Sequence, residues 1–459
     1  MNRFINISLS QLFSAVIAIA LSMAVLFACE QFDPERIVKV ETVSIENLDA
    51  TSCTAQGLIL DTGEDGIDQH GFCWSEAGNP SIEDNRNDLG PKGTKGSFSG
   101  SLTGLSLGTR YNVRAYATNS IGTSYGSIES FTTHNTPTIK TLPVSSLTNI
   151  SAETGGNIAD NGGAPVTARG VCWSTTSGPT ISDSKTTNGS ETGSYTSSLT
   201  GLSSNTRYYV RAYATNSIGT GYGNEVIFTT YSGETVTDYD GNIYYTIQIG
   251  DQLWMANNLK VTHYSDGTAI PLVEDDVDWV AVDQTERAYC YYRNEIGYAN
   301  VYGALYTWAA AMNGAASSDA ISSGVQGVCP DGWHLPSDAE WKELEKYLGL
   351  SQAEADAMLF RGTDEGSQLA GNSSLWDDGA LKDDPAFGSS GFTFVPAGGR
   401  ASTSGVYMNM DYQGYLWSTT EDANSNLQAY TRYLDNDTTG IYRQNYLKDN
   451  GCSVRCVKD

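Results

Sequence analysis

The sequence predicts a mainly-β protein, in which two antiparallel β-sandwiches in tandem precede an α+β module with about three short helices. The first observation is an internal repeat: Arg114–Thr123 recurs letter for letter as Arg211–Thr220, one domain length further along the chain. The second is composition, since 48 Gly, and 27 Tyr against 12 Phe, are typical of short strands joined by tight turns. The third is a change of composition after Gly233, where the repeat ends.

The two copies of the repeat predict sandwiches over residues 37–134 and 135–231. Along residues 111–117 two sets of side chains alternate, so each set lies on one face of a strand. Clusters of Gly, Asn and Ser separate such runs, as in an antiparallel sandwich.

The strongest signature inside the repeat surrounds one tyrosine. Leu105, Thr109 and Tyr111 precede Val-Arg-Ala, and the same spacing leads to Tyr208 in the second copy. This pattern resembles the corner between strands E and F of fibronectin type III domains. The resemblance implies that each tyrosine buries its ring and ties its hydroxyl to backbone upstream. We interpret the pair as a spacer that lifts the C-terminal module off a membrane; a ligand site on the sandwich loops is the alternative.

The C-terminal module, residues 232–459, opens with a predicted hairpin. Its turn, Asp238–Asn242, lies between two short runs with strand composition. The Asp-x-Asp-Gly spacing also suggests a calcium loop, but the twelfth position is Ile249, where an EF-hand needs Glu. We therefore favour the hairpin turn.

Three helices are predicted in this module. The first is the Ala-rich segment 302–312. The second begins at a capping box of Ser337 and Glu340 and ends at Gly349, and the third begins at a second box, at Ser351. Segments 391–396 and 451–458 are the clearest strands expected among the remaining residues.

Several stretches of this module, in the same order, resemble the Fibrobacter succinogenes major paralogous domain. They are Asp240–Tyr244, Trp254–Leu259, Tyr302–Trp308, Cys329–Pro336, Trp417–Glu421 and Ser453–Val457. That family resembles the C-type lectin-like fold, which formylglycine-generating enzymes also use. The resemblance therefore implies a fold more than a function.

Four cysteines of the module allow three disulfide connectivities: Cys290, Cys329, Cys452 and Cys456. The lectin-like resemblance favours Cys329–Cys456, because such folds staple the last strand to the body, and this leaves Cys290–Cys452. In the sandwiches, Cys73 and Cys172 occupy equivalent positions, and their thiols are expected to face outward. A Cys53–Cys73 bridge would require both to face the core.

The N-terminus predicts export and lipid attachment. Residues 1–28 have a positive start and an apolar run, which ends at Leu-Phe-Ala before Cys29. This ending resembles a bacterial lipobox, which implies a lipid on Cys29. Within the acidic tether 29–36, residues Glu30–Glu35 resemble the tag that sends lipoproteins of the Bacteroidota to the outer cell face, and a plain acidic tether is the alternative. We therefore expect a protein anchored in the outer membrane and facing the exterior.

Composition and motifs limit the classes of function that fit this sequence. A formal net charge of −27 argues against nucleic acid as a partner, because phosphate binding needs clustered Lys and Arg. The four histidines form no metal-ligand spacing, and no catalytic motif occurs, so no enzyme activity, metal or cofactor is expected. The prediction is a module that binds a glycan or a surface protein. An enzyme on the lectin-like scaffold and a purely structural envelope component are the alternatives.

Candidate ligand contacts are aromatic, amide and carboxylate side chains near the C-terminus, which could stack on and hydrogen-bond a sugar or peptide. They are Trp376, Tyr412, Tyr415, Trp417, Glu421 and Asn424. A place in the core is the competing interpretation for Trp417.

Overall fold

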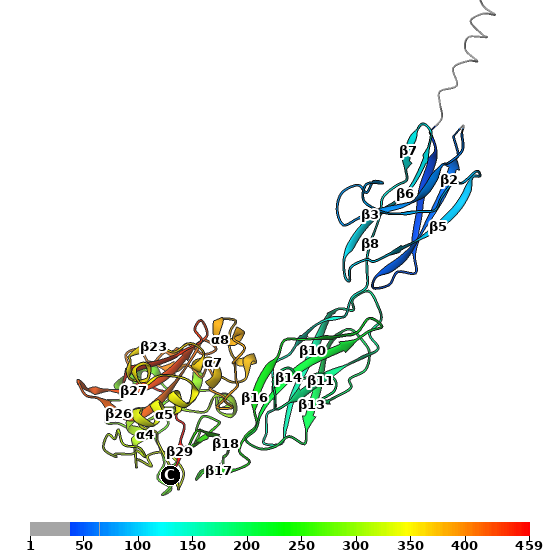
Figure 1. Ribbon diagram of the computed structural model, residues 1–459. Helices are drawn as coiled ribbons and strands as arrows, with labels where there is room; N and C mark the ends of the chain where they lie inside the picture. The colour runs from blue at the N-terminus through cyan, green and yellow to red at the C-terminus, as the bar shows by residue number, and fades with distance from the viewer. Residues whose placement is uncertain (1–36, 64) are drawn as a thin grey trace, which may run out of the picture. The chain divides into compact units, whose positions relative to one another are not determined.

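The computed structural model describes residues 37–63 and 65–459. The predicted signal segment, Cys29 and the acidic tether lie outside the described residues. The described chain divides into two compact units, one formed by residues up to 135 with 162–164, the other by 136–161 with 165–459 (Figure 1). In the part described, no helix has the length and apolar character that a membrane crossing requires.

The first sandwich consists of two antiparallel sheets. One sheet contains β1 (Lys39–Glu46), β2 (Ser52–Asp61) and β5 (Gly96–Thr103). The other contains β4 (Asn85–Asp88), β3 (Gln69–Ser75), β6 (Arg110–Asn119), β7 (Gly122–Tyr125) and β8 (Glu129–Thr132). Alternate side chains of both sheets meet in one apolar core, as the period of two predicts.

The second sandwich repeats this arrangement strand for strand. One sheet contains β9 (Thr138–Thr141), β10 (Ser151–Asp160) and β13 (Gly193–Thr200). The other contains β12 (Ser184–Lys185), β11 (Ala168–Ser174), β14 (Arg207–Thr215), β15 (Thr220–Tyr222) and β16 (Val226–Thr229). Both sandwiches pack a sheet of three strands against a sheet of five, a fibronectin type III-like layout.

The corner tyrosines confirm the expectation from the sequence. The hydroxyl of Tyr111 accepts a hydrogen bond from the backbone N–H of Ser106 at 3.1 Å. The hydroxyl of Tyr208 accepts one from Ser203 at 2.9 Å. Both rings are buried, so each corner is held by packing and by one buried hydrogen bond.

The sandwich cysteines Cys73 and Cys172 face away from the apolar cores, as expected from the sequence, but they are not exposed to solvent. Both lie outside the apolar clusters, and both are fully buried. The Cys172 thiol donates to the carbonyl of Pro179 at 3.5 Å, so the loop after β11 covers this outer face. Cys53 and Cys73 remain free thiols, and no bridge joins them.

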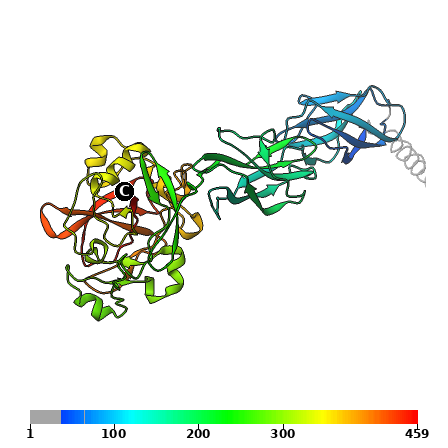
Figure 2. The same ribbon diagram turned by 90° about the horizontal axis from the view of Figure 1, so that it is seen from below.

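Two larger sheets form the body of the C-terminal module (Figure 2). The first has the order β17 (Thr235–Thr237), β18 (Ile243–Ile249), β19 (Gln252–Met255), β29 (Val457–Lys458) and β22 (Trp333–His334). The second has the order β23 (Leu359–Arg361), β28 (Ile441–Leu447), β27 (Ser425–Asp435) and β26 (Gln413–Asp422). Two pairs of short strands complete it: β20 (Tyr289–Cys290) with β21 (Leu305–Tyr306), and β24 (Gly399–Arg400) with β25 (Tyr407–Met408).

The hairpin predicted at Asp238–Asn242 is present between β17 and β18. Within the turn, the backbone N–H and side-chain amide of Asn242 both donate to the Asp238 carboxylate. Asp240 accepts from Thr262 and lies 2.6 Å from the ring nitrogen of His263. The two carboxylates are therefore engaged in fixing the turn, which supports the hairpin interpretation.

The two capping boxes are confirmed. Ser337 and Glu340 cap α5 (Asp338–Leu348), which ends at Gly349 with φ of 141°. Ser351 and Glu354 cap α6 (Gln352–Asp356). In each box the serine and the glutamate are only three residues apart, so the box forms without any tertiary contact.

Other elements of the module differ from the prediction. The helix expected over 302–312 is interrupted at Gly303, whose φ is 79°, and splits into α3 (Ala299–Tyr302), β21 and α4 (Trp308–Met312). Segment 391–396 is not a strand, because Thr393 has a left-handed φ of 57° and only Phe394 makes an isolated bridge. Segment 451–458 has strand geometry only in β29, with isolated bridges before it.

The module has few helices and all are short, as expected. Three of those in the described residues were not among the helices predicted from the sequence: α2 (Asp276–Ala281), α7 (Glu365–Leu369) and α8 (Ala380–Asp383). Three 3₁₀ turns also occur there: η1 (Tyr292–Asn294), η2 (Ile296–Tyr298) and η3 (Ser373–Leu375).

A buried ionic network joins α5 to the second large sheet. Asp338 and Glu345 of α5 contact Arg361 of β23, Arg432 of β27 and Arg443 of β28, with nitrogen–oxygen distances of 2.7 Å for Arg361–Glu345 and Arg432–Asp338. Burial opposes ionisation of Asp338, but the guanidinium groups of Arg432 and Arg443 outweigh it and hold the pKa of this carboxyl well below its usual range. The helix is thus fixed to the sheet by paired charges.

Candidate ligand-binding pocket

Three of the six predicted contact residues belong to the core. Trp417 is 0% exposed, and its indole N–H donates to the carbonyl of Tyr306 at 2.8 Å. Trp376 is buried and donates to the carbonyl of Gly371 at 3.2 Å. Tyr415 is buried in the same cluster as Trp417. Burial excludes ligand contact for these three, since a ring enclosed by protein cannot stack on a ligand, and it confirms the competing interpretation that Trp417 belongs to the core.

Glu421 and Asn424 lie apart from the aromatic residues, at the end of the β26–β27 hairpin. Glu421 forms an ion pair with Lys448. The backbone N–H of Asn424 donates to the Asp422 carboxylate at 3.1 Å, which fixes the turn. The structure therefore does not bring the six residues together on one surface.

Tyr412 is the predicted residue that the structure places at a pocket. It is 51% exposed and lies in the loop between β25 and β26. The pocket has a volume of about 420 Å³, within the range of small-ligand sites. Its lining residues are Tyr292, Arg293, Tyr298, Tyr302, Asn409, Met410, Asp411 and Tyr412.

Two irregular segments build this pocket, which we call the Tyr412 pocket. One runs from η1 through η2 into α3, and the other is the loop 409–412. Arg293, Asn409 and Asp411 have left-handed φ values of 51°, 58° and 70°. Such conformations are uncommon outside glycine and gather at ligand-contacting sites, so their concentration here indicates a site held in shape by its surroundings.

Hydrogen bonds fix one side of the polar lining. The hydroxyl of Tyr302 donates to one Asp411 carboxylate oxygen at 3.1 Å. Burial, together with the charge of Asp411, raises the pKa of Tyr302 well above its ordinary value, so this tyrosine stays protonated as the donor. The side-chain amide of Asn409 donates to Gln413 at 2.7 Å and to the Tyr415 hydroxyl at 3.1 Å.

On the other side of the lining, Arg293 is held by fewer contacts. The guanidinium of Arg293 lies 5.7 Å from the centre of the Tyr292 ring, a cation–π contact. Within the described part of the chain, Arg293 has no ion-pair partner. No three His, Cys, Asp or Glu side chains of the described residues are grouped so as to hold a metal ion. The pocket therefore offers aromatic faces, one cation, one carboxylate and one amide.

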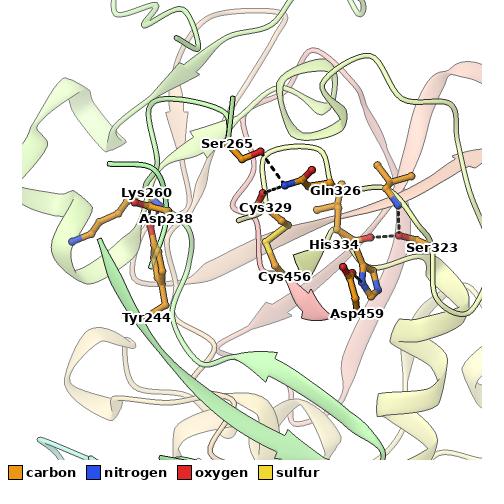
Figure 3. The surroundings of a disulfide bond; sticks show 12 residues. Asp238, Tyr244, Lys260, Ser265, Ser323, Gln326, Cys329, His334, Cys456 and Asp459 are labelled. Atoms are coloured by element: carbon orange, nitrogen blue, oxygen red, sulfur yellow. Dashed lines mark hydrogen bonds and ion pairs between the residues drawn. A yellow bond between two sulfur atoms is a disulfide. The ribbon is translucent and has the colours of Figure 1, made fainter. Parts of the chain in front are cut away.

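A disulfide lies next to the first large sheet, because Cys456 directly precedes β29. Cys329 and Cys456 are bonded, with 6.0 Å between their Cα atoms, as the lectin-like resemblance implied (Figure 3). The second expected bridge is absent, because Cys290 and Cys452 are free buried thiols. Cys290 pairs with Leu305 and Cys452 with the next residue, Tyr306, so their side chains lie on opposite faces and in different apolar clusters.

Beside the disulfide, His334 contacts two carboxylates. Its Nε2 lies 2.7 Å from Glu340, and its Nδ1 lies 2.8 Å from Asp459, which is labelled beside it in Figure 3. Burial by itself lowers the pKa of His334, but the hydrogen bonds and charges of Glu340 and Asp459 outweigh it and raise the pKa above its ordinary value. Both ring nitrogens of His334 are engaged by carboxylates, so this cluster joins the C-terminal residue Asp459 to the start of α5.

Sequence reasoning missed most of the Tyr412 pocket. The residues that it did not single out are Tyr292, Arg293, Tyr298, Tyr302, Asn409, Met410 and Asp411. The available signal was a high density of tyrosine between 289 and 306, together with Asn and Asp beside Tyr412. These residues follow no regular spacing, because both segments are irregular, so the sequence does not show that they meet in one pocket.

Comparison with known proteins identifies the C-terminal module. Residues 247–458 match the family model described as the Fibrobacter succinogenes major domain, so the C-terminal module carries this domain. The match begins inside β18 and ends inside β29, so it covers the second large sheet, the first large sheet apart from β17 and the start of β18, and the Tyr412 pocket. Among curated proteins, none matches this chain.

Solved structures give weak likenesses. A two-domain fibronectin type III segment of chicken tenascin is 15% identical, with a TM-score of 0.20, covering 42% of this chain and 99% of that one. The sensor domain of the anti-sigma factor RsgI4 from Pseudobacteroides cellulosolvens is 17% identical, with a TM-score of 0.18. That alignment covers 22% of this chain and 97% of the sensor domain. Because these scores are low, the sandwich assignment rests on strand order and on the corner tyrosines.

Proposed function

We propose that this protein is a cell-surface lipoprotein whose C-type lectin-like C-terminal module binds a ligand, for recognition or adhesion, on a stalk of two fibronectin type III-like sandwiches. The observation that carries the proposal is the Tyr412 pocket, where exposed aromatic surface adjoins a cation, a carboxylate and an amide. Tandem sandwiches before a Fibrobacter succinogenes major domain fit a surface or adhesion-type protein.

Binding is the function that this pocket supports best. The lectin-like hydrolase considered above would need two carboxylates in one cleft, and the lining of the Tyr412 pocket supplies only Asp411. A thiol site would need Cys452 and Cys456 reduced together, and Cys456 is bonded to Cys329. A purely structural envelope component would have no use for a preformed pocket of this size.

The anchor in this proposal is a lipid on Cys29, with the chain in the outer membrane and facing the exterior. Support comes from the apolar run, the Leu-Phe-Ala-Cys ending and the acidic residues that follow. Each buried methylene of an acyl chain adds about 0.8 kcal/mol of membrane affinity, so several chains hold a protein firmly.

Palmitate labelling and protease treatment of intact cells test the anchor. The native chain is expected to incorporate labelled palmitate and to be cut by an added protease. A Cys29→Ala variant is expected to lose the label and leave the membrane fraction. A native chain that takes up no palmitate and fractionates with the cytosol would refute the location.

Glycan and protein arrays test the binding function with the whole chain. Tyr412→Ala is expected to abolish capture, because it removes the exposed ring of the pocket. Tyr347→Ala is the matched control, since Tyr347 is 66% exposed on α5 and does not line the pocket. Equal capture by both variants would mean that the Tyr412 pocket is not the binding site.

A further inference from the structure

The rings of the Tyr412 pocket divide into a fixed set and one exposed ring. Tyr298 packs edge-to-face against Tyr292 and Tyr302, with ring centres 6.2 and 5.9 Å apart. Tyr292 and Tyr302 are buried, so these contacts hold the three rings in place. Tyr412 makes no ring pair within the described chain, and half of it is exposed. Its face is thus available to a ligand.

Three planar polar groups line the pocket together with that ring: the amide of Asn409, the carboxylate of Asp411 and the guanidinium of Arg293. The amide N–H groups of Asn409 donate to Gln413 and Tyr415, so Asn409 offers a ligand its Oδ1 as an acceptor, whereas the guanidinium of Arg293 offers several donors in one plane. One Asp411 oxygen accepts from Tyr302, which orients the carboxylate and leaves the second oxygen without a partner among the described residues. Two neighbouring hydroxyls of a sugar ring can donate to such acceptors and accept from such donors.

The charges of the pocket favour an uncharged ligand. Arg293 and Asp411 bring one positive and one negative charge to the same lining, so neither sign dominates there. The chain as a whole carries a formal net charge of −27, which repels acidic polymers at a distance. A carboxylate-bearing ligand would also meet Asp411, and a cationic one would meet Arg293.

We infer that the Tyr412 pocket recognises a neutral pyranose unit of a glycan, which stacks on Tyr412 and bonds through adjacent hydroxyls to Asp411, Asn409 and Arg293. Sugars in this form have an apolar C–H face and a polar edge, so they match an aromatic ring flanked by planar polar groups. This inference rests on the proposed binding function and specifies its ligand class. In this proposal the side chains contact the sugar directly, without a bridging metal ion.

Calorimetric titration of the full chain with defined oligosaccharides tests the inference. The probes are hexasaccharides of β-1,4-glucan, β-1,3-glucan, β-1,4-mannan, β-1,4-xylan and α-1,4-glucan, and the acidic comparator is hexagalacturonate. At least one neutral probe is expected to bind with a Kd on the order of 0.1–1 mM, unchanged by a chelator. Affinity should change less than about twofold between low and high salt, since an uncharged ligand is not screened.

Variants assign that binding to the pocket. Tyr412→Ala and Asp411→Ala are each expected to weaken it by about tenfold or more, whereas Tyr347→Ala leaves it unchanged. The circular dichroism spectrum of each variant must match that of the native chain. Should Asp411→Ala perturb the fold through loss of the Tyr302 contact, Arg293→Ala serves instead, because Arg293 is exposed and unpaired.

The outcomes separate this inference from the proposed function. Salt-sensitive binding of hexagalacturonate, or capture of a peptide, that is lost in Tyr412→Ala would keep the binding function and overturn the neutral-sugar class. Neutral-sugar binding that survives Tyr412→Ala would overturn the assignment to this pocket. An absence of any Tyr412-dependent ligand on the arrays and in calorimetry would overturn both.

Discussion

The first sandwich and the C-terminal module both enclose a buried centre, but the side chains at those centres differ in chemistry. Between the two sheets of the sandwich lie residues such as Val38, Phe72 and Val113, all apolar. The module has apolar clusters too, yet it also buries the ion pairs of Asp338 and Glu345 with three arginines.

The difference shows which interactions specify each fold. A sandwich core follows from a two-residue period, so neighbouring residues in the chain determine it. In the module, Glu345 of α5 meets Arg432 of β27, and Cys329 meets Cys456, across long stretches of sequence. Breaking one such pair should therefore destabilise the module and leave the first sandwich, which belongs to a separate compact unit, intact.

The largest effect is expected from Glu345→Leu. This change removes the carboxylate that pairs with Arg361 and Arg432, both nearly inaccessible to water. Removing one partner of a buried ion pair costs about 3–5 kcal/mol, because the other charge is left uncompensated. Hydrogen exchange with mass spectrometry, which resolves amides of the module from those of the sandwiches, is the measurement.

Glu343→Leu is its matched control on the same helix. Glu343 pairs with Lys346 at the surface, so its loss should change stability by less than about 1 kcal/mol. Equal protection of module amides in the two variants would mean that the buried network contributes no net stability. Loss of protection in the first sandwich would contradict its independence from the module.

Removing the disulfide ranks next. A Cys329→Ser/Cys456→Ser double variant opens a loop that spans 127 residues of sequence. Loss of a native disulfide costs about 2–4 kcal/mol, chiefly by freeing the unfolded chain. Thermal unfolding with and without reductant measures the effect. The described sandwich cysteines are free, so reductant should not alter sandwich unfolding, and an equal shift in both parts would contradict the prediction.

The same contrast explains how much the sequence predicts. Sandwich limits, corner hydrogen bonds and capping boxes follow from short-range patterns, such as Tyr111 with Ser106 or Ser337 with Glu340. The Cys329–Cys456 bridge came from family resemblance rather than from spacing. The sequence does not predict where one residue with an unusual backbone conformation interrupts an element. An example is Gly303, whose positive φ of 79° interrupts the helix expected over 302–312.

For the ligand site, the sequence predicted one residue of the pocket, Tyr412. Trp417 and Tyr415 have the composition of a binding surface but lie on the inner face of β26. Which face of a strand is buried depends on what packs against it, and for β26 that partner includes Tyr306, far away in sequence. Arg293 and Asp411 come from two irregular loops, where no period signals that they meet.

A smaller loss of stability is expected from removing the corner hydroxyls, and comparing this loss between the two sandwiches tests whether they are equivalent. Tyr111→Phe and Tyr208→Phe each remove one buried hydroxyl while keeping the ring, so each should cost about 1–2 kcal/mol. Tyr209→Phe is the control, because its hydroxyl has no hydrogen bond within the described chain. Chemical denaturation followed by hydrogen exchange resolves the sandwiches, and a cost confined to one corner would show that the repeats have diverged energetically.

The smallest expected effect is a pH dependence confined to the module. The pKa of His334 is raised in the folded state, so the stability that its charged form contributes is fully present below the unfolded pKa of about 6.5. That stability declines as pH rises through the folded pKa. Unfolding free energies measured from about pH 6 to about pH 9 should therefore fall for the module.

Asp459→Asn should move this decline to lower pH, since it removes one of the two carboxylates that hold the proton on His334. The Glu340 contact at 2.7 Å remains in that variant, so the decline should persist with a smaller amplitude. His334→Gln should abolish it, because an amide does not titrate. A decline that is unchanged in His334→Gln would assign the pH dependence to other groups and leave His334 with a packing role alone.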